Sequence, residues 1–177
     1  MQLDYYSVDK CNKAMDGVNT LIHLAGADAN SYLGDPENMI RHHGGLMERL
    51  IFAAKNNSVE KFIYFSTIHV YGNLPKGIIT EDRTPEPASA YGLTHFLSES
   101  VCRYYNEKTE TQCINVRLSN SYGSPIFKES NCWWLVINDL IRTAFSEKKI
   151  KLISDGLSQR DFIHGDDVVR AIEILLN

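Results

Sequence analysis

The sequence predicts an α/β protein built on a parallel β-sheet with helices on both faces. Short apolar runs alternate along the chain with longer segments in which apolar residues recur at near-helical spacing. The short runs are almost continuously apolar, as expected of strands that are buried on both faces. Strands separated by helices favour parallel pairing, because parallel strands need a long crossover connection.

Each predicted element follows from its own residues. The apolar runs end in small or polar residues, and the longer segments place their apolar residues on one face. The last helix has Asp166 and Asp167 in its first turn, where acids favour a helix start. The predicted strands are 19–26, 60–67, 111–119 and a short 150–154, and the predicted helices are 37–57, 91–108, 132–149 and 165–176.

The connection over 71–90 is rich in glycine and proline and is longer than most loops. We interpret it as a functional loop rather than a domain boundary, since no repeat or linker-like tract interrupts the chain. Residues 1–177 are therefore expected to belong to a single domain.

Composition argues against several classes of function. A formal net charge of -4 does not favour binding to nucleic acid or to an anionic membrane. No apolar run approaches the roughly 20 residues of a membrane span, and the first residues do not resemble a secretory signal. The cysteines are Cys11, Cys102, Cys113 and Cys132, and they form neither a C-x-x-C pair nor a zinc-like spacing. We expect reduced thiols, no bound metal and a cytoplasmic protein.

Residues suited to ligand binding follow the predicted strands, where an open α/β sheet binds its ligands. The small residues Ala25, Gly26 and Ala27 end the first strand, where a ligand could approach the backbone closely. Ser66 and Thr67 end the second strand, in a position to face the same ligand.

Tyr91 and His95 lie four residues apart on a predicted helix and therefore share one face. A hydroxyl that polarises an alcohol or carbonyl, such as Thr67, and a tyrosine that moves the proton would serve a nicotinamide redox step. Asn120 follows the third strand.

Five segments together resemble the extended short-chain dehydrogenase/reductase family, in its branch of NAD-dependent nucleotide-sugar epimerases and dehydratases. They are TLIHLAG, FIYFSTIHVYG, SAYGLTHFLSES, INVRLSNSYGSP and QRDFIHGDDVVRAI, in the family's order and at its spacing. The resemblance implies a Rossmann-like doubly wound sheet, NAD or NADP as cofactor and a nucleoside-diphosphate sugar as substrate. Residues 124–164 would then include the start of the substrate-binding lobe.

The resemblance also implies roles for individual residues. Thr67 matches the catalytic Ser/Thr and Tyr91 the catalytic tyrosine, while Asn120 and Arg160 match positions that hold the diphosphate of the nucleotide sugar. Ile68–His69 stand where sugar dehydratases carry Asp-Glu, which counts against 4,6-dehydration and favours epimerisation or reduction. The implied or predicted cofactor contacts are Asp4, Tyr5, Ala25, Gly26, Ala27 and Ser66.

Each of these residues also has a purely structural interpretation. Thr67 could cap a helix or turn, Tyr91 could pack a helix onto the sheet, and Asn120 could form a turn. Arg160 could pair with Asp161 at the surface. In addition, the adjacent pair 42–43, both histidines, is interpreted as part of a solvated helix face.

Two departures from the family pattern bear on activity. His95 stands where the family has a lysine whose charge stabilises the tyrosinate, and an ordinary histidine is mostly neutral at pH 7. Tyr91 should therefore stay a neutral phenol unless His95 is held protonated. The chain also contains no G-x-x-G-x-x-G turn to bind the pyrophosphate at a helix N-terminus.

We therefore expect a partial Rossmann-like domain that lacks the family's first strands and Gly-rich loop and that binds NAD poorly. Whether it is an enzyme stays open, because a non-catalytic relative acting as a binding or assembly module would fit the same residues. The strand at 19–25 would then have an unpaired edge, and three outcomes are open: a second chain supplies a strand, residues 1–6 fold back over the edge, or the isolated chain aggregates. We favour the first, in a homo-oligomer or with a strand-completing partner, or the third, because six residues give little length for β-pairing.

Overall fold

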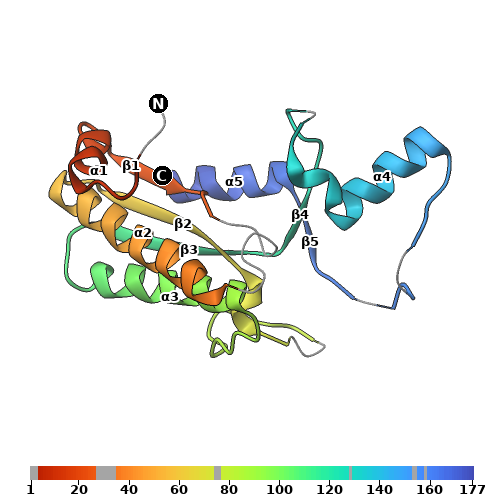
Figure 1. Ribbon diagram of the computed structural model, residues 1–177, viewed down its shortest axis with the longest axis horizontal. Helices are drawn as coiled ribbons and strands as arrows, with labels where there is room; N and C mark the ends of the chain where they lie inside the picture. The colour runs from red at the N-terminus through yellow and green to blue at the C-terminus, as the bar shows by residue number, and fades with distance from the viewer. Residues whose placement is uncertain (1–3, 27–34, 74–76, 128, 153–154, 158) are drawn as a thin grey trace. The chain divides into compact units, whose positions relative to one another are not determined.

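The computed structural model describes residues 4–26, 35–73, 77–127, 129–152, 155–157 and 159–177 (Figure 1). The chain divides into two compact units, Met1–Leu118 and Ser119–Asn177. Each unit has its own secondary structure, and each is described by itself below.

The first unit is built on a three-stranded parallel sheet. Its strands are β1 (Thr20–His23), β2 (Lys61–Thr67) and β3 (Gln112–Leu118), in the order β1-β2-β3. Both neighbouring pairs are parallel, with Lys61 opposite Thr20 on one side and Gln112 on the other. The predicted α/β class and parallel sheet are confirmed, and β1 is shorter than the predicted strand.

The helices of the first unit begin where the sequence supplies a cap. They are α1 (Val8–Met15), α2 (Pro36–Asn56) and α3 (Ala90–Asn106), with a 3₁₀ turn, η1 (Ile68–Tyr71), directly after β2. Asp35 caps α2 by accepting from the Asn38 amide at 3.0 Å, and Pro36 occupies the first turn. Helix α1 was not among the predicted elements; Ser7 caps it.

The core of the first unit lies between the sheet and its helices. Figure 1 shows α2 and α3 running side by side, and apolar residues from both helices meet β2. Phe62 and Tyr64 from β2 belong to this cluster, as do Leu50 and Ile51 from α2 and Cys102 from α3. Burial of these side chains supplies the main stabilisation of the unit.

The second unit pairs two short parallel strands, β4 (Asn120–Tyr122) and β5 (Phe162–His164). Its helices are η2 (Asn131–Trp134), α4 (Val136–Glu147) and α5 (Gly165–Leu176). The predicted helix at 132–149 therefore starts later than expected, because Ser130 caps the separate turn η2. No helix in the described part of the chain is long and apolar enough to cross a membrane.

The predicted strand at 150–154 is wrong over its described part. Residues 150–152 form no strand, and residues 153–154 lie outside the described residues. Ile150 and Leu152 are both exposed, so the apolar alternation in this segment does not reflect burial in a sheet. The strand that pairs with β4 is β5, about ten residues later in the chain.

Candidate active site

Thr67 ends β2 and caps the 3₁₀ turn that follows. Its hydroxyl oxygen accepts a hydrogen bond from the His69 amide at 3.3 Å, and the side chain is buried. The capping role that the structural interpretation gave to Thr67 is therefore present. This bond uses a lone pair of the oxygen, so it does not consume the hydroxyl proton.

Tyr91 lies in the first turn of α3, close against η1. Ser89 caps the helix by accepting from the Gly92 amide at 3.1 Å. A Cβ atom at Gly92 would lie 2.4 Å from the His69 carbonyl oxygen, so only glycine permits this approach. The Tyr91 ring then meets the His69 ring edge-on, with centroids 5.7 Å apart. The structure thus brings the predicted tyrosine to the turn that Thr67 caps.

His95 packs against Tyr91 but bonds to a different tyrosine. The rings of Tyr91 and His95 are 4.5 Å apart, while His95 Nδ1 and the Tyr64 hydroxyl oxygen share a hydrogen bond of 2.7 Å. Burial, and to a lesser degree the nearby histidines, lower the pKa of His95 to about 4. His95 is therefore uncharged at pH 7 and does not supply the cation that the family's lysine would.

His95 belongs to a group of four buried rings that we call the imidazole cluster: His23, His43, Tyr64 and His95. Tyr64 stacks on His23 at 5.7 Å and on His95 at 5.8 Å, and His43 lies 5.5 Å from His95. Burial lowers the pKa of His23 to about 4, with a smaller contribution from His43. His23 and His95 are therefore neutral at pH 7, and neither supplies the charge that the family's lysine would.

His43 corrects one expectation from the sequence. It was assigned to a solvated helix face, yet it is 8% exposed. Its face of α2 turns toward α3 and toward the end of β1, where a Cβ atom on Gly26 would lie 3.1 Å from the His43 ring. Among the described residues, no group of three or more His, Cys, Asp or Glu side chains is arranged to hold a metal ion.

Ser66, a predicted cofactor contact, is bonded into the protein interior. Its hydroxyl donates to Glu99 Oε1 at 2.6 Å, and Glu99 forms an ion pair with Arg117 at 2.7 Å. We call Ser66, Tyr71, Glu99 and Arg117 the ion-pair cluster. Its side chains link β2, η1, α3 and β3 beside the candidate site.

The remaining predicted cofactor contacts lie near β1 and α1. Ala25 and Gly26 are exposed beyond the end of β1, and Ala27 lies outside the described residues. Asp4 binds locally: its carboxylate pairs with Lys10 at 3.2 Å and accepts from the Tyr6 amide, which lowers its pKa. Tyr5 packs against the core of the first unit.

A groove of about 420 Å³ runs along β1. Within the described residues β1 pairs with β2 alone, so its other edge has no strand beside it. Ile22 is 39% exposed and Leu24 is 67% exposed there. The groove is lined by Tyr5, Ala14, Met15, Val18, the segment 20–25 and Leu50.

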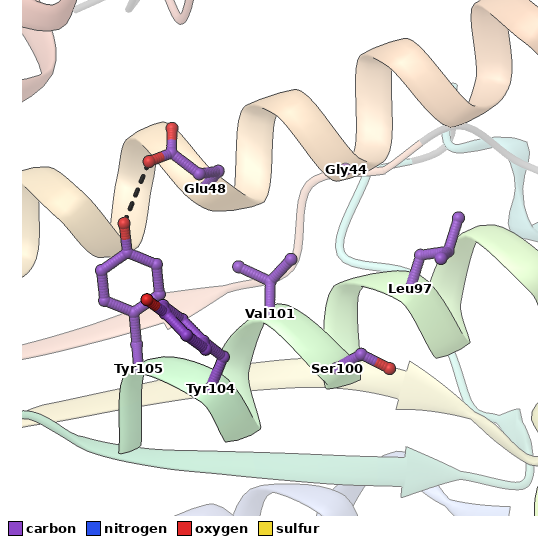
Figure 2. Close-up of a pocket in the computed structure, with 7 residues that line it drawn as sticks. All are labelled: Gly44, Glu48, Leu97, Ser100, Val101, Tyr104 and Tyr105. Atoms are coloured by element: carbon purple, nitrogen blue, oxygen red, sulfur yellow. Dashed lines mark hydrogen bonds between the residues drawn. The ribbon is translucent and has the colours of Figure 1, made fainter. Parts of the chain in front are cut away.

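A second groove, of about 530 Å³, lies between α2 and α3 and contains none of the predicted site residues (Figure 2). At one end the Tyr105 hydroxyl donates to Glu48 at 2.9 Å. Leu97, Val101 and Tyr104 are among the residues that line it. This groove is therefore separate in composition from the candidate active site.

Asn120 and Arg160 lie in the second unit. The Asn120 side-chain amide donates to the Asp161 carbonyl at 2.9 Å, and Arg160 is exposed directly before Asp161. Pairing of β4 with β5 thus keeps the two predicted diphosphate contacts close together. Their role toward Thr67 and Tyr91 stays a prediction.

Three features of the site were missed by sequence reasoning. The first is the close packing of Gly92 on η1. The glycine after the tyrosine in SAYG is a sequence signal for it, because Gly92 lies inside a helix. The Glu99–Arg117 pair joins residues that are 18 positions apart, and nothing in their spacing indicates the contact. The partnership of Tyr64 with His95 joins a strand to a helix and likewise leaves no local signal.

Comparison with known proteins agrees with this geometry. The model of the NAD dependent epimerase/dehydratase family matches residues 1–177. An uncharacterized UDP-glucose epimerase of Bacillus subtilis, YtcB, is 26% identical over 92% of this chain and 50% of its own length. A dTDP-glucose 4,6-dehydratase of Streptomyces griseus is 29% identical over 91% of this chain and 48% of its own.

Solved structures show the same fold. The UDP-glucuronic acid 4-epimerase of Bacillus cereus, in complex with UDP-glucuronic acid and NAD, superposes with a TM-score of 0.81 at 26% identity, over 98% of this chain and 54% of that one. The chain thus spans about half the length of the curated relatives it matches. Its sequence, its parallel sheet and the order of its motifs agree with those of the family whose model it matches. The chain belongs to the NAD-dependent epimerase/dehydratase family.

Proposed function

We propose that this chain is a nucleotide-sugar epimerase or reductase relative whose proton-transfer residues are assembled and whose cofactor side is impaired. The observation that carries the proposal is the close packing of Gly92 on η1, which holds Tyr91 against the turn that Thr67 caps. Without this close approach, nothing in the described residues would place the Tyr91 side chain near Thr67, and the two could not act on one substrate oxygen.

In this proposal Thr67 and Tyr91 act on the same sugar oxygen. The Thr67 hydroxyl keeps its proton and donates to that oxygen, while the Tyr91 phenol gives or takes the reacting proton. Asn120 and Arg160 hold the diphosphate, with the guanidinium matching two phosphate oxygens. The absence of the acidic pair at 68–69 supports epimerisation or reduction over dehydration.

NAD, when bound, would supply the hydride acceptor, but the described residues fit it only in part. The exposed backbone of Ala25 and Gly26 leaves room for a ligand. Against this, the Ser66 hydroxyl is donated to Glu99, and His95 is neutral and bonded to Tyr64.

The cofactor part of the proposal is tested by calorimetric titration of the purified 177-residue chain with NAD. We expect weak binding, because the chain has no Gly-rich turn to present backbone donors to the pyrophosphate. Binding in the micromolar range would contradict an impaired cofactor side.

The substrate part is tested with UDP-glucose and UDP-glucuronic acid, which related structures contain. Saturation-transfer NMR should detect binding of one of them to the parent chain. Arg160→Ala should weaken that binding and Tyr91→Phe should leave it nearly unchanged, since only the first removes a diphosphate contact. Equal binding to the parent and to Arg160→Ala would remove Arg160 from the proposal.

A second candidate function is a non-catalytic binding or assembly module, which the exposed edge of β1 favours. A second copy or another chain would then add a strand beside β1 and cover Ile22 and Leu24. Hydrogen exchange tests this: fast exchange at 20–23 beside slow exchange in β2 and β3 indicates an open edge. Uniform strong protection in a proven monomer would argue against it.

We also propose a cytoplasmic location, which the four free cysteines support.

A further inference from the structure

The ion-pair cluster contains more hydrogen bonds than charge pairing needs. Glu99 is fully buried, and its carboxylate receives Arg117 Nε at 3.0 Å and Nη2 at 2.7 Å, together with the Ser66 hydroxyl. Two of the three guanidinium nitrogens therefore satisfy the buried carboxylate in a bidentate arrangement. These contacts raise the pKa of Arg117, so the side chain remains a cation throughout the accessible pH range.

The third guanidinium nitrogen points elsewhere. Arg117 Nη1 donates to the Tyr71 hydroxyl oxygen at 2.7 Å and to the Glu81 carbonyl at 3.1 Å. The Tyr71 hydroxyl in turn donates to the Thr80 carbonyl at 3.3 Å. One nitrogen thus fixes two consecutive carbonyls of the connection between η1 and α3, directly and through Tyr71.

That connection sets where α3 begins. Its later residues fold back on η1, since a Cβ atom on Gly72 would lie 2.0 Å from the Glu86 carbonyl oxygen. Ser89 then caps α3 and Tyr91 follows within the first turn. The connection therefore positions the first turn of α3, and Tyr91 in it, together with the contact of Gly92 on η1, while Thr67 is fixed by the end of β2.

We propose that Arg117 is a positioning residue for the candidate active site: its third nitrogen anchors the connection and thereby sets the place of Tyr91 relative to Thr67. The proposal rests on the proposed function for its significance, since it concerns the same two residues. Its structural content stands apart from that function, because the position of Tyr91 is measurable without cofactor or sugar.

The decisive variant is Tyr71→Phe in the full chain. It removes the hydroxyl that links Arg117 to the Thr80 carbonyl and leaves the Glu99–Arg117 pair and the stacked ring in place. The reporter is the Cζ resonance of Tyr91 in protein labelled with [ζ-¹³C]tyrosine, assigned by its loss in Tyr91→Phe. We expect that resonance to shift and broaden in Tyr71→Phe, because Tyr91 then samples several positions against His69 and His95.

Two further variants separate positioning from general stability. Tyr105→Phe is the matched control, since it deletes another tyrosine–protein hydrogen bond, the one to Glu48 in Figure 2, and should leave the Tyr91 resonance unchanged. Arg117→Lys keeps the charge and the Tyr71 hydroxyl but has one nitrogen instead of three. It should reproduce the Tyr91 shift seen in Tyr71→Phe.

The proposal is overturned if Tyr71→Phe and Tyr105→Phe lower the urea midpoint alike while the Tyr91 resonance stays in place. It is equally overturned if Arg117→Lys retains the resonance of the parent, since Arg117 would then not set the position. Failure of the NAD or sugar titrations leaves these results untouched, so the two proposals fail separately.

Discussion

The imidazole cluster and the ion-pair cluster both bury polar side chains, but they differ in whether those side chains are charged. Both place polar side chains between β2 and α3: Tyr64 meets His95, and Ser66 meets Glu99. The ion-pair cluster keeps its charges, because a bidentate guanidinium compensates the buried carboxylate. The imidazole cluster offers no anion to a protonated ring, so burial drives His23 and His95 to the neutral form. A buried charge is retained here only where its partner is complete.

The largest effect should come from removing one partner of the ion pair. Arg117→Met leaves the Glu99 carboxylate buried without a counter-charge, and we expect a loss of about 3–5 kcal/mol in the free energy of unfolding. Urea denaturation measures it. The double variant Glu99→Leu/Arg117→Met should recover most of that loss, and a double variant as unstable as the single one would show that packing, not charge, is responsible.

The imidazole cluster should make stability depend on pH. Each of its two low-pKa histidines titrates near 4 when folded and near 6.5 when unfolded, so the unfolded chain binds more protons between these values. The full contribution of these histidines to the free energy of unfolding should be present above pH 6.5. It should be lost as the pH drops toward 4, by roughly 3 kcal/mol for each histidine. Denaturation curves between pH 7 and 4.5 measure this. His23→Phe should flatten the dependence, and an unchanged slope would exclude His23 as a source.

Placing a cation in the imidazole cluster should show what the missing charge would do to Tyr91. His95→Lys introduces a charge beside Tyr91 and should lower the pKa of the Tyr91 phenol by at least about one unit, or about 1.4 kcal/mol. A UV phenolate titration measures it, with Tyr91→Phe to assign the signal. An unmoved midpoint in a folded variant would mean that the new amine is neutral or turned away from Tyr91.

The smallest effect is expected at an exposed ion pair of similar length. Arg41 and Glu37 are 2.7 Å apart on the surface of α2, as Arg117 and Glu99 are in the interior. Because solvent screens the exposed pair, Arg41→Ala should change the free energy of unfolding by less than about 0.5 kcal/mol. A loss approaching that of Arg117→Met would break the argument that burial, not distance, sets the value of these pairs.

Much of the fold could be predicted because its signals are local. The apolar runs that form β1, β2 and β3 are contiguous. The serine at 89 and the helical periodicity that follows it indicate α3. The segment at 150–152 failed because two apolar residues alternating with lysines satisfy the strand pattern without a partner strand. A pattern shows that a segment could pair, and only the rest of the chain decides whether it does.

The candidate site was accessible from sequence only through its motif residues. Thr67 and Tyr91 could be named because they stand in segments with a recognisable order. The neutral state of His95 could not be derived firmly, since it follows from burial against His23, His43 and Tyr64, which come from three other elements. Contacts between distant residues, such as Glu99 with Arg117, depend on the packing of α3 over the sheet.

The cap on η1 has a consequence for how Thr67 meets any ligand. A free hydroxyl rotates about its C–O bond, and a ligand that binds it must stop that rotation. Here the oxygen already receives the His69 amide, so the hydrogen can sweep only the remaining directions. Part of the orientational entropy of the donor is thus lost when the protein folds rather than when a ligand arrives, and an incoming oxygen meets a hydroxyl that is already aimed.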